Sequence, residues 1–359
     1  MFLFRYLSLA ACLLISSSKI TALNEEYSAI EHTAAVVKKD SLEGLYFSTH
    51  IIWEGLEIKE YNLKKLVEFR TKHKNLPVIH LISPSYASNS LKRYKLKNAI
   101  EKVFKKGDKV GVYLSGWKNI VEEANVDFKA GNSFWGNQLK SDCRQCGSET
   151  PLTNYNSAEL KKIIEWSIEE VDDLGLGTPT SSLIAGWQSN QDILNILADN
   201  NIKVDFSMIA PYRTVQTLKH QHLYHLLLDL WGYRSESLSP IARQFSSDKI
   251  FQIPNNFAHP GIIPYSYAKP MLDQLFNAIE RDTYKGATVS IMVSQSRADK
   301  DIHQLSRFAK ELYNNAKRKK IDVMHLLETP IFSDPESIKL SRSGTWSWPN
   351  TKPASSQPL

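Results

Sequence analysis

Apolar segments rich in β-branched residues alternate along most of the chain with segments of helical periodicity. This alternation is typical of β/α units, in which each buried parallel strand is followed by a helix that covers the sheet. Residues 289–293 form a nearly continuous apolar run, as expected of a strand buried on both faces. The predicted strands are residues 45–52, 77–82, 109–115, 181–185, 204–209, 250–253, 288–294 and 322–326.

Helical segments connect several of these strands. Residues 157–174 place apolar side chains on one stripe, with Ser157 as the expected N-cap and Gly175 in the left-handed position after the end. Residues 91–106 repeat this pattern and end before Gly107, and residues 192–200 join two strands in a compact βαβ unit. The sequence therefore predicts an α/β fold, a distorted or incompletely closed (β/α) barrel of seven or eight strands.

The overall charge does not point to a nucleic-acid partner. The 359 residues include 44 Lys and Arg against 38 Asp and Glu, which gives a formal net charge of +6. Acidic and basic residues are mixed along most of the chain, and the short basic run at 317–320 is typical of a solvated helix end. We therefore expect no nucleic acid among the partners.

The first 22 residues are interpreted as a secretory signal peptide. Arg5 precedes a short apolar stretch at 7–15, which small and polar residues follow. The stretch is shorter than the roughly 20 residues of a membrane span, and we expect no transmembrane segment in the mature chain. Residues 23–340 would then form the barrel and 341–359 a flexible tail in a secreted or periplasmic protein. Lipidation at Cys12 remains open.

Two cysteines would remain after cleavage. Cys143 and Cys146 form a CxxC pair with no second pair nearby, so they do not complete a tetrahedral zinc site. Gly147 and Pro151 follow them, which favours a loop over the helix start of a redox motif. We predict a disulfide that closes a small part of the long loop at 126–155.

In a parallel barrel the functional side chains lie at the carboxyl ends of the strands. The positions there are rich in aromatic and amide groups and poor in clustered carboxylates and imidazoles. Aromatic rings stack on the apolar faces of sugars, and amides bind sugar hydroxyls, so this composition favours glycan recognition. The candidate site residues are His50, Glu54, Trp117, Trp187, Asn255 and Gln295.

Several short motifs follow one another along the chain: LPVIHLISPSY at 76–86, GWKN at 116–119, FWG at 134–136, CG at 146–147 followed by Pro151, Leu152 and Tyr155, AGW at 185–187, and VDFS at 204–207. In this order, from about residue 45 to residue 329, the chain resembles one group of polysaccharide-deacetylase-like proteins. This resemblance implies a distorted β/α barrel whose active members remove N- or O-acetyl groups from polysaccharides with the help of a bound metal. An Asp and two His residues hold the metal in such enzymes.

The chain departs from this family at the catalytic positions. His50 and Ile52 replace acidic residues, and only Glu54 is retained after the first strand. Tyr113 and Ser115 stand where the family has a pair of histidines. Ser148 and Ser294 replace two further histidines, and Leu183 or Ile184 replaces an arginine. We therefore expect no resident metal and no metal-dependent deacetylation.

Other arrangements of catalytic groups remain open. His50, Glu54 and His80 would be the ligands of a rearranged zinc site, although a mid-strand histidine such as His80 is more often a core residue. Glu54 and Glu149 would suit a glycosidase-like pair, but the sequence does not fix the distance between their carboxyl groups.

The sequence thus predicts a secreted, deacetylase-like protein that acts as a glycan-binding or assembly component in cell-envelope or exopolysaccharide production, with a polysaccharide or peptidoglycan-type glycan as its partner. An active deacetylase with rearranged ligands is one alternative. A protein-interaction scaffold, with an envelope protein as its partner, is another.

Overall fold

The computed structural model describes residues 44–55, 57–86, 89–133, 149–209, 223–227, 241–244, 249–257, 259–281, 286–333, 339–340 and 346–347. The chain divides into Met1–Ser41 and Leu42–Leu359, and the described residues belong to the second of these units. The predicted signal peptide and the predicted Cys143–Cys146 disulfide lie outside the described residues.

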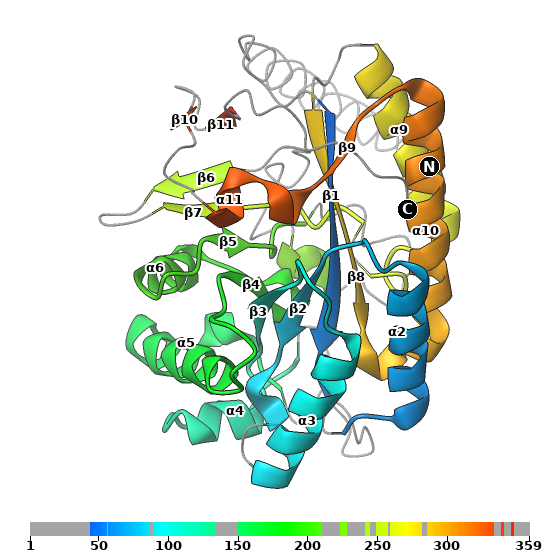
Figure 1. Cartoon of the computed structure of the whole chain (residues 1–359). Helices are drawn as coiled ribbons and strands as arrows, with labels where there is room; N and C mark the ends of the chain where they lie inside the picture. Colours follow the sequence, from blue (N-terminus) through cyan, green and yellow to red (C-terminus); the bar gives the residue numbers. More distant parts are fainter. Residues whose placement is uncertain are drawn as a thin grey trace, which may run out of the picture. The chain divides into compact units, whose positions relative to one another are not determined.

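One large sheet dominates the described part of the chain (Figure 1). Its hydrogen-bonded order is β6-β7-β5-β4-β3-β2-β1-β8, and β9 pairs additionally with β1. All pairs are parallel except β6 with β7. The strands are β1 (Gly44–Trp53), β2 (Val78–Ile82), β3 (Lys109–Leu114), β4 (Ser181–Ile184), β5 (Val204–Asp205), β6 (Ile241–Gln244), β7 (Lys249–Gln252), β8 (Gly286–Ser294) and β9 (Val323–His325).

This topology confirms the predicted α/β fold with a parallel, incompletely closed sheet. Among the described strands, β8 pairs with β1 and β6 pairs with β7, but these two ends of the sheet do not pair with each other. Each of the eight predicted strands has a counterpart, although β5 ends at Asp205 rather than residue 209. The hydroxyl of Ser207 accepts the backbone N–H of Ile184 at 2.8 Å, so a side chain replaces the next rung of the ladder.

Helices connect most of the parallel strands and cover the outside of the sheet (Figure 1). The predicted βαβ unit is confirmed, since α6 joins the parallel pair β4 and β5. Gly107 and Gly175 follow α3 and α5 with positive φ, as predicted. The longer helices are α2 (Glu60–Lys72), α3 (Ser90–Val103), α5 (Ser157–Asp172), α6 (Gln191–Asp199), α9 (Tyr265–Glu280) and α10 (Ala298–Lys319), and the shorter ones are α4 (Lys118–Glu123) and α11 (Pro330–Ser333).

The N-cap of α5 differs from the prediction. Asn156, not Ser157, caps the helix and forms a capping box with Glu159. An Asn at this position accepts from the free N–H groups of the first turn more favourably than most residues do. Ser157 instead donates to Asp192 at 2.7 Å and so links α5 to α6.

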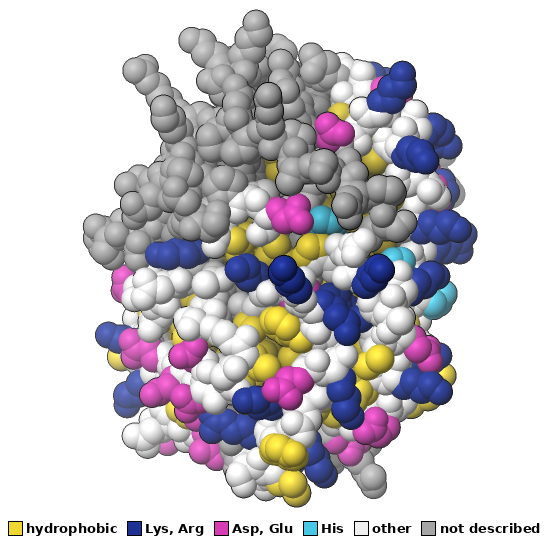
Figure 2. All heavy atoms as spheres, in the orientation of Figure 1, with side chains coloured by type: hydrophobic (Ala, Val, Ile, Leu, Met, Phe, Trp, Pro, Cys, Tyr) yellow, Lys and Arg dark blue, Asp and Glu magenta, His cyan; other side chains and the backbone are white. Residues whose placement is uncertain are grey.

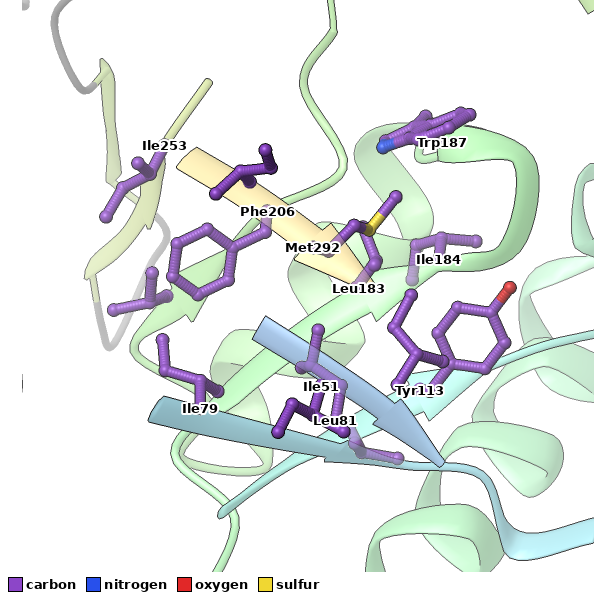
Figure 3. Close-up of a cluster of buried hydrophobic side chains, with 14 of the residues drawn as sticks. Ile51, Ile79, Leu81, Tyr113, Leu183, Ile184, Trp187, Phe206, Ile253 and Met292 are labelled. Atoms are coloured by element: carbon purple, nitrogen blue, oxygen red, sulfur yellow. The ribbon is translucent and has the colours of Figure 1, made fainter. Parts of the chain in front are cut away.

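The two faces of the sheet have different partners. His50 on β1 is in register with Ile79 on β2, so both side chains point to the inner face. Figure 3 shows part of the apolar core, with Tyr113 at its border and its hydroxyl group directed away from the apolar side chains. Phe47 on β1 points to the outer face, because it lies an odd number of residues from His50. There the centroid of its ring lies 6.4 Å from the ring centroid of Phe308 on α10.

Three short strands were not predicted. The sequence of β6 contains Arg243 and Gln244 and lacks the apolar run of the other strands. Within the predicted tail, β11 (Trp346–Ser347) pairs with β10 (Lys339–Leu340) in a separate two-stranded sheet. The flexible tail itself stays a prediction. In the described part of the chain, every helix is too short or too polar to cross a membrane.

Candidate functional site

Glu54 directly follows β1, and its backbone is tied to two other strand ends. Its carbonyl oxygen accepts the amide N–H of Gln295, which follows β8, at 2.7 Å. The same oxygen accepts the hydroxyl of Tyr86, which follows β2, at 3.1 Å. Gln295 also donates to the Tyr86 hydroxyl at 3.0 Å. These bonds fix Glu54 at the carboxyl end of the sheet, where functional groups of β/α folds gather.

Glu149 reaches the same end of the sheet from a segment later in the chain. Its backbone forms a β-bridge with Trp117, just after β3, and the N–H of Thr150 donates to the carbonyl of Gly116 at 3.0 Å. A Cβ at Gly116 would lie 2.0 Å from the Thr150 carbonyl oxygen. Glycine is therefore required for this close approach, which places Glu149 beside β3.

Five side chains at this end of the sheet form two hydrogen-bonded groups, which we together call the carboxyl cluster: Glu54 with Tyr113 and Ser294, and Glu149 with Trp117. The hydroxyls of Tyr113 and Ser294 bond the Glu54 carboxyl group. The indole of Trp117 bonds the Glu149 carboxyl group. The two carboxyl groups also act electrostatically on each other, so the cluster is a coupled pair of acids.

The surroundings affect the pKa values of the two carboxyl groups differently. Burial raises the pKa of Glu149 well above its usual range, and the charge of Glu54 raises it further. Burial also raises the pKa of Glu54, but the hydrogen bonds from Ser294 and Tyr113 and the charge of Arg297 oppose this rise. The proton therefore favours Glu149, while Glu54 is the more easily ionised member.

Three buried side chains that follow β3, β4 and β8 have a polar atom without a described partner. Ser115 is 1% exposed, and its hydroxyl oxygen has no hydrogen-bond partner among the described residues. Ser115 directly follows β3, two residues after Tyr113. The side-chain carbonyl of Gln295 and the amide nitrogen of Gln188, which follows β4, also lack described partners. Such atoms are rare in folded proteins, and an ordered water or a bound polar ligand satisfies them.

The structure brings together three of the six predicted site residues. Glu54 and Trp117 belong to the carboxyl cluster, and Gln295 holds the Glu54 backbone. Trp187 and Asn255 lie instead in or beside the inner core: Figure 3 shows Trp187 close to Met292, whose sulfur accepts the Asn255 amide at 3.4 Å. Both side chains are buried, and their contact with a glycan stays a prediction.

His50 lies deep inside the sheet, away from the carboxyl cluster. Its Nε2 lies 3.2 Å from the hydroxyl of Ser48 and 3.4 Å from that of Ser290. Burial lowers the pKa of His50 to about 3, so the imidazole is neutral. Four residues along a strand span about 13 Å, which is too far for His50 and Glu54 to bind one metal ion.

His80 lies on the opposite face of the sheet. Its Nδ1 accepts the indole N–H of Trp53 at 3.0 Å, and its Nε2 lies 3.0 Å from a carboxylate oxygen of Asp108. Its ring also stacks on Phe104 at the end of α3. The structure thus corrects the proposed ligand set: His50, Glu54 and His80 do not converge, and His80 is the core residue that its mid-strand position indicated.

The donor groups of the cluster do not fit the metal centre of a deacetylase. A catalytic zinc site needs three protein ligands and an open position. Glu54 and Glu149 supply two carboxyl groups, and burial favours the protonated form of both. In the described ranges, no three His, Cys, Asp or Glu side chains lie close enough to hold a metal ion. We therefore derive no step through a metal.

Sequence reasoning found part of the cluster. The sequence offers Glu149 as a partner for Glu54. However, the two residues lie too far apart in the chain for their sequence separation to predict a contact. Tyr113 and Ser294 were recognised as replacements of family histidines, but their bonds to Glu54 were not predicted. Polar residues next to strand ends at the same edge of a parallel sheet are the signal that could have found them.

No protein-family model matches the chain, and no curated protein sequence matches it. Its chain path is similar to that of a putative polysaccharide deacetylase from Mycobacterium smegmatis, with 11% identity and a TM-score of 0.43 over 81% of this chain and 96% of that one. A CE4 family pseudoenzyme from Bacillus anthracis matches with 9% identity and a TM-score of 0.36, over 81% of this chain and 66% of that one.

A third similar structure is larger. The 4-α-glucanotransferase from Thermococcus litoralis matches with 10% identity and a TM-score of 0.41, over 79% of this chain. The match covers 38% of the glucanotransferase chain, so this protein spans well under half of its length. At these identities and TM-scores the likeness is a remote one of the overall chain path.

Proposed function

We propose that this protein binds a polysaccharide at the carboxyl cluster and does not carry out metal-dependent deacetylation. One observation carries the proposal: the Tyr113 hydroxyl bonds the Glu54 carboxyl group at a position where the deacetylase resemblance implies a metal-binding histidine. A phenol that remains protonated is a hydrogen-bonding group and not a metal ligand of that kind. Burial and the nearby carboxyl groups raise the pKa of Tyr113 well above its usual range.

Metal-dependent deacetylation has a chemical requirement that this cluster does not meet. The bound zinc ion lowers the pKa of water from about 15.7 to about 7 and polarises the acetyl carbonyl. An acid or base acting alone typically contributes about 10²–10⁴-fold, which is less than the 10⁶-fold or more expected of enzymes. Two coupled carboxyl groups without imidazole ligands are therefore better suited to bind sugar hydroxyls than to activate water for attack on an amide or ester.

The polar groups of the site match the hydroxyl-rich surface of a sugar. Carboxyl groups accept and, when protonated, donate hydrogen bonds, and hydroxyls and amides do both. The unpartnered atoms of Ser115, Gln188 and Gln295 add such groups at the ends of β3, β4 and β8. Sites of this kind hold a ligand in one orientation through a few well-placed polar groups.

Exposed aromatic side chains at the same end of the sheet support a polymeric ligand. Tyr61 on α2 and Tyr94 on α3 are 62% and 64% exposed, and Leu91 on α3 is 60% exposed. These residues lie in the first two turns of helices that follow β1 and β2, so they flank the carboxyl ends of those strands. Figure 2 shows hydrophobic side chains exposed at the lower end of this face, where α3 begins in Figure 1.

We place the protein outside the cytoplasm, in cell-envelope or exopolysaccharide production. The signal peptide proposed at 1–22 supports this location, and the polymer-binding surface supports the role. The glycan would be a polysaccharide or a peptidoglycan-type polymer. An envelope protein remains the partner expected if the chain acts as a scaffold.

The experiment compares glycan binding with acetate release. Purified protein is tested by affinity electrophoresis against partially acetylated chitosan, acetylated xylan and peptidoglycan, and acetate release is measured with and without added Zn²⁺. Glu54→Gln is compared with Glu123→Gln, which alters an exposed carboxyl at the end of α4. We expect binding that only Glu54→Gln weakens, and no acetate. Zinc-dependent acetate release, or binding to none of these glycans, contradicts the proposal.

A further inference from the structure

The exposed face of helix α10 carries charge of one sign, and a hollow opens beside it. We infer that this face binds an acidic polysaccharide, one whose sugar units bear carboxylate groups. The inference is independent of the carboxyl cluster and adds a second glycan-binding surface to the proposed function.

The exposed side chains of α10 are basic along nearly the whole helix. After Asp299 in the first turn, every exposed side chain up to the end of α10 is basic except Asn314. Most of them are spaced three, four, three and seven residues apart, which places them on one face of the helix. At a rise of about 1.5 Å per residue, this face is about 26 Å long. We call it the basic stripe: Lys300, His303, Arg307, Lys310 and Lys317. Figure 2 shows Lys and Arg side chains along the edge of the molecule where α10 runs in Figure 1.

The acidic groups of α10 do not neutralise the basic stripe. Asp301 is buried and accepts the guanidinium N–H of Arg297 at 2.9 Å. Glu311 is only partly exposed and lies 4.0 Å from the ammonium group of Lys269 on α9. Within the part of the chain that the structure describes, no acidic side chain forms an ion pair with a member of the stripe. Its positive charges are therefore available to an external partner.

An ordinary solvated helix face does not account for the stripe. On the neighbouring helix α2 the exposed charges alternate in sign: Glu60, Lys64, Glu68 and Lys72. On α10, by contrast, Lys300 lies in the first turn, where the helix dipole disfavours a cation. Arg307 and Lys310 are three residues apart and repel each other. Charges that destabilise the helix that carries them are compensated when an anionic partner binds.

The hollow lies between α9 and α10, at the middle of the basic stripe. It has a volume of about 480 Å³, and Tyr265, Lys269, His303 and Arg307 are among the residues that line it. The guanidinium carbon of Arg307 lies 4.1 Å from the centroid of the Tyr265 ring, a cation–π contact that orients the group. The side-chain oxygen of Gln304 accepts the backbone N–H of Tyr265 at 3.1 Å and so joins the two helices. The volume is within the range of small-molecule sites, so the hollow accommodates a sugar unit with its carboxylate near Arg307.

The surroundings of the stripe favour a single polymer chain over a broad anionic surface. On α9 the partly exposed carboxylates of Asp273 and Glu280 pair with lysines, so the surplus of positive charge is confined to the stripe. A bilayer or a DNA duplex would contact these carboxylates as well. The apolar side of α10, which includes Phe308 and Leu312, is buried against the rest of the fold and cannot insert into lipid. A polysaccharide chain can follow the narrow stripe and place one unit in the hollow.

The test is a calorimetric titration of the purified protein with polygalacturonate at about 50 mM and about 200 mM salt. Methyl-esterified polygalacturonate is the uncharged comparison polymer. The stripe variant combines Lys300→Gln, Arg307→Gln, Lys310→Gln and Lys317→Gln. The control variant removes the same number of charges at other exposed positions, Lys102→Gln, Lys106→Gln, Lys109→Gln and Lys162→Gln.

We expect polygalacturonate to bind the wild type and the control variant equally well, and the esterified polymer to bind much more weakly. The stripe variant should bind polygalacturonate about tenfold to a hundredfold more weakly and should depend less on salt, because each exposed charge contributes modestly and is screened. Arg307→Gln alone should cost more affinity than Lys317→Gln alone, because Arg307 lines the hollow and Lys317 does not. An equal loss in these two single variants overturns the placement of a sugar unit in the hollow.

Equal losses in the stripe variant and the control variant overturn the inference, because net charge alone would then explain the binding. Tighter binding to phosphatidylglycerol vesicles or to duplex DNA than to polygalacturonate, at the same salt concentration, also overturns it. No binding to polygalacturonate overturns it as well and leaves the carboxyl-cluster proposal standing. A loss in Glu54→Gln of binding to acetylated xylan, with polygalacturonate binding unchanged, supports two separate surfaces. Thermal melts followed by circular dichroism check that each variant is folded.

Discussion

The indole N–H of Trp53 donates to Nδ1 of His80 at 3.0 Å, across the outer face of two neighbouring strands. Because Nδ1 is the acceptor, the neutral imidazole carries its proton on Nε2, which lies 3.0 Å from the Asp108 carboxylate. Burial lowers the pKa of His80 and favours this neutral form. Both ring nitrogens are therefore used within the core, and neither is available to a metal.

Asp108 is the centre of this network, and its loss should destabilise the fold. Its carboxylate accepts two bonds from the buried Arg70 guanidinium at 2.8 and 2.9 Å, and two further bonds from the backbone N–H groups of Val78 and Lys105. Asp108→Asn leaves Arg70 as an uncompensated buried charge, so we expect the free energy of unfolding to fall by about 3–5 kcal/mol. Urea denaturation measures this change, and the exposed Asp127→Asn is the control.

Asp108 precedes β3, at the end of the sheet opposite to the carboxyl cluster. Residues at the amino ends of barrel strands contribute to stability rather than to function. Glycan binding of Asp108→Asn, measured well below its unfolding temperature, should therefore equal that of the wild type. A selective loss of binding with normal stability would contradict this assignment.

Zinc binding gives a second prediction. Since His50 and His80 point to opposite faces of the sheet, His50→Gln and His80→Gln should not change the amount of zinc that the purified protein retains. His80→Gln should lower the free energy of unfolding by about 1–3 kcal/mol, because it disturbs the bonds to Trp53 and Asp108. Metal analysis by mass spectrometry checks the first expectation. A stoichiometric zinc ion lost in both variants would restore the rearranged metal site.

These residues also illustrate how far the sequence could predict the structure. The alternation of apolar runs and helical segments was enough for the parallel sheet, because strands buried on both faces need nearly continuous apolar sequence. The same alternation placed His80 in the core. No local pattern predicts the partner of Glu54, because Glu149 lies far from it in the sequence and is held beside Trp117, where Gly116 admits the close approach of the Thr150 backbone.

That close approach gives the third prediction. A methyl group at Gly116 would lie 2.0 Å from the Thr150 carbonyl oxygen, so Gly116→Ala must displace the segment that carries Glu149. We expect a loss of about 1–3 kcal/mol in unfolding free energy and weaker glycan binding. Gly131→Ala is a matched control, because its Cβ would lie 3.6 Å from the hydroxyl of the same Thr150. Similar behaviour of the two variants in isothermal titration calorimetry would show that this contact does not position Glu149.

The carboxyl pair also predicts a pH dependence of stability. The pKa of Glu149 is raised in the folded state, so the folded protein binds this proton more tightly than the unfolded chain. This contribution is fully present below the unfolded pKa of about 4.3 and is lost as the pH rises through the folded pKa, at about 1.4 kcal/mol for each unit between the two. Glu149→Gln removes it, so the variant should gain stability relative to the wild type from pH 5 to pH 8.

Urea denaturation at both pH values measures this difference. Buried histidines such as His50, whose pKa is lowered, change stability in the opposite direction, but they are present in both proteins and cancel in the comparison. Glu123→Gln should show no such gain, because its carboxyl group is exposed. A constant difference between wild type and Glu149→Gln across this range would refute the raised pKa.

The exposed tyrosines should distinguish a polymer from a short sugar. Tyr61 and Tyr94 lie on different helices and flank the carboxyl ends of β1 and β2, so a short oligosaccharide held at the carboxyl cluster would not reach both. An aromatic contact contributes about 0.5–1.5 kcal/mol, and Tyr61→Ala combined with Tyr94→Ala should weaken polymer binding roughly fivefold to a hundredfold. Binding of a disaccharide from the same polymer should change little, since its contacts are with the cluster. Calorimetric titration of both ligands tests this prediction. An equal loss of affinity for both ligands would show that the tyrosines belong to the primary site and do not contact an extended polymer.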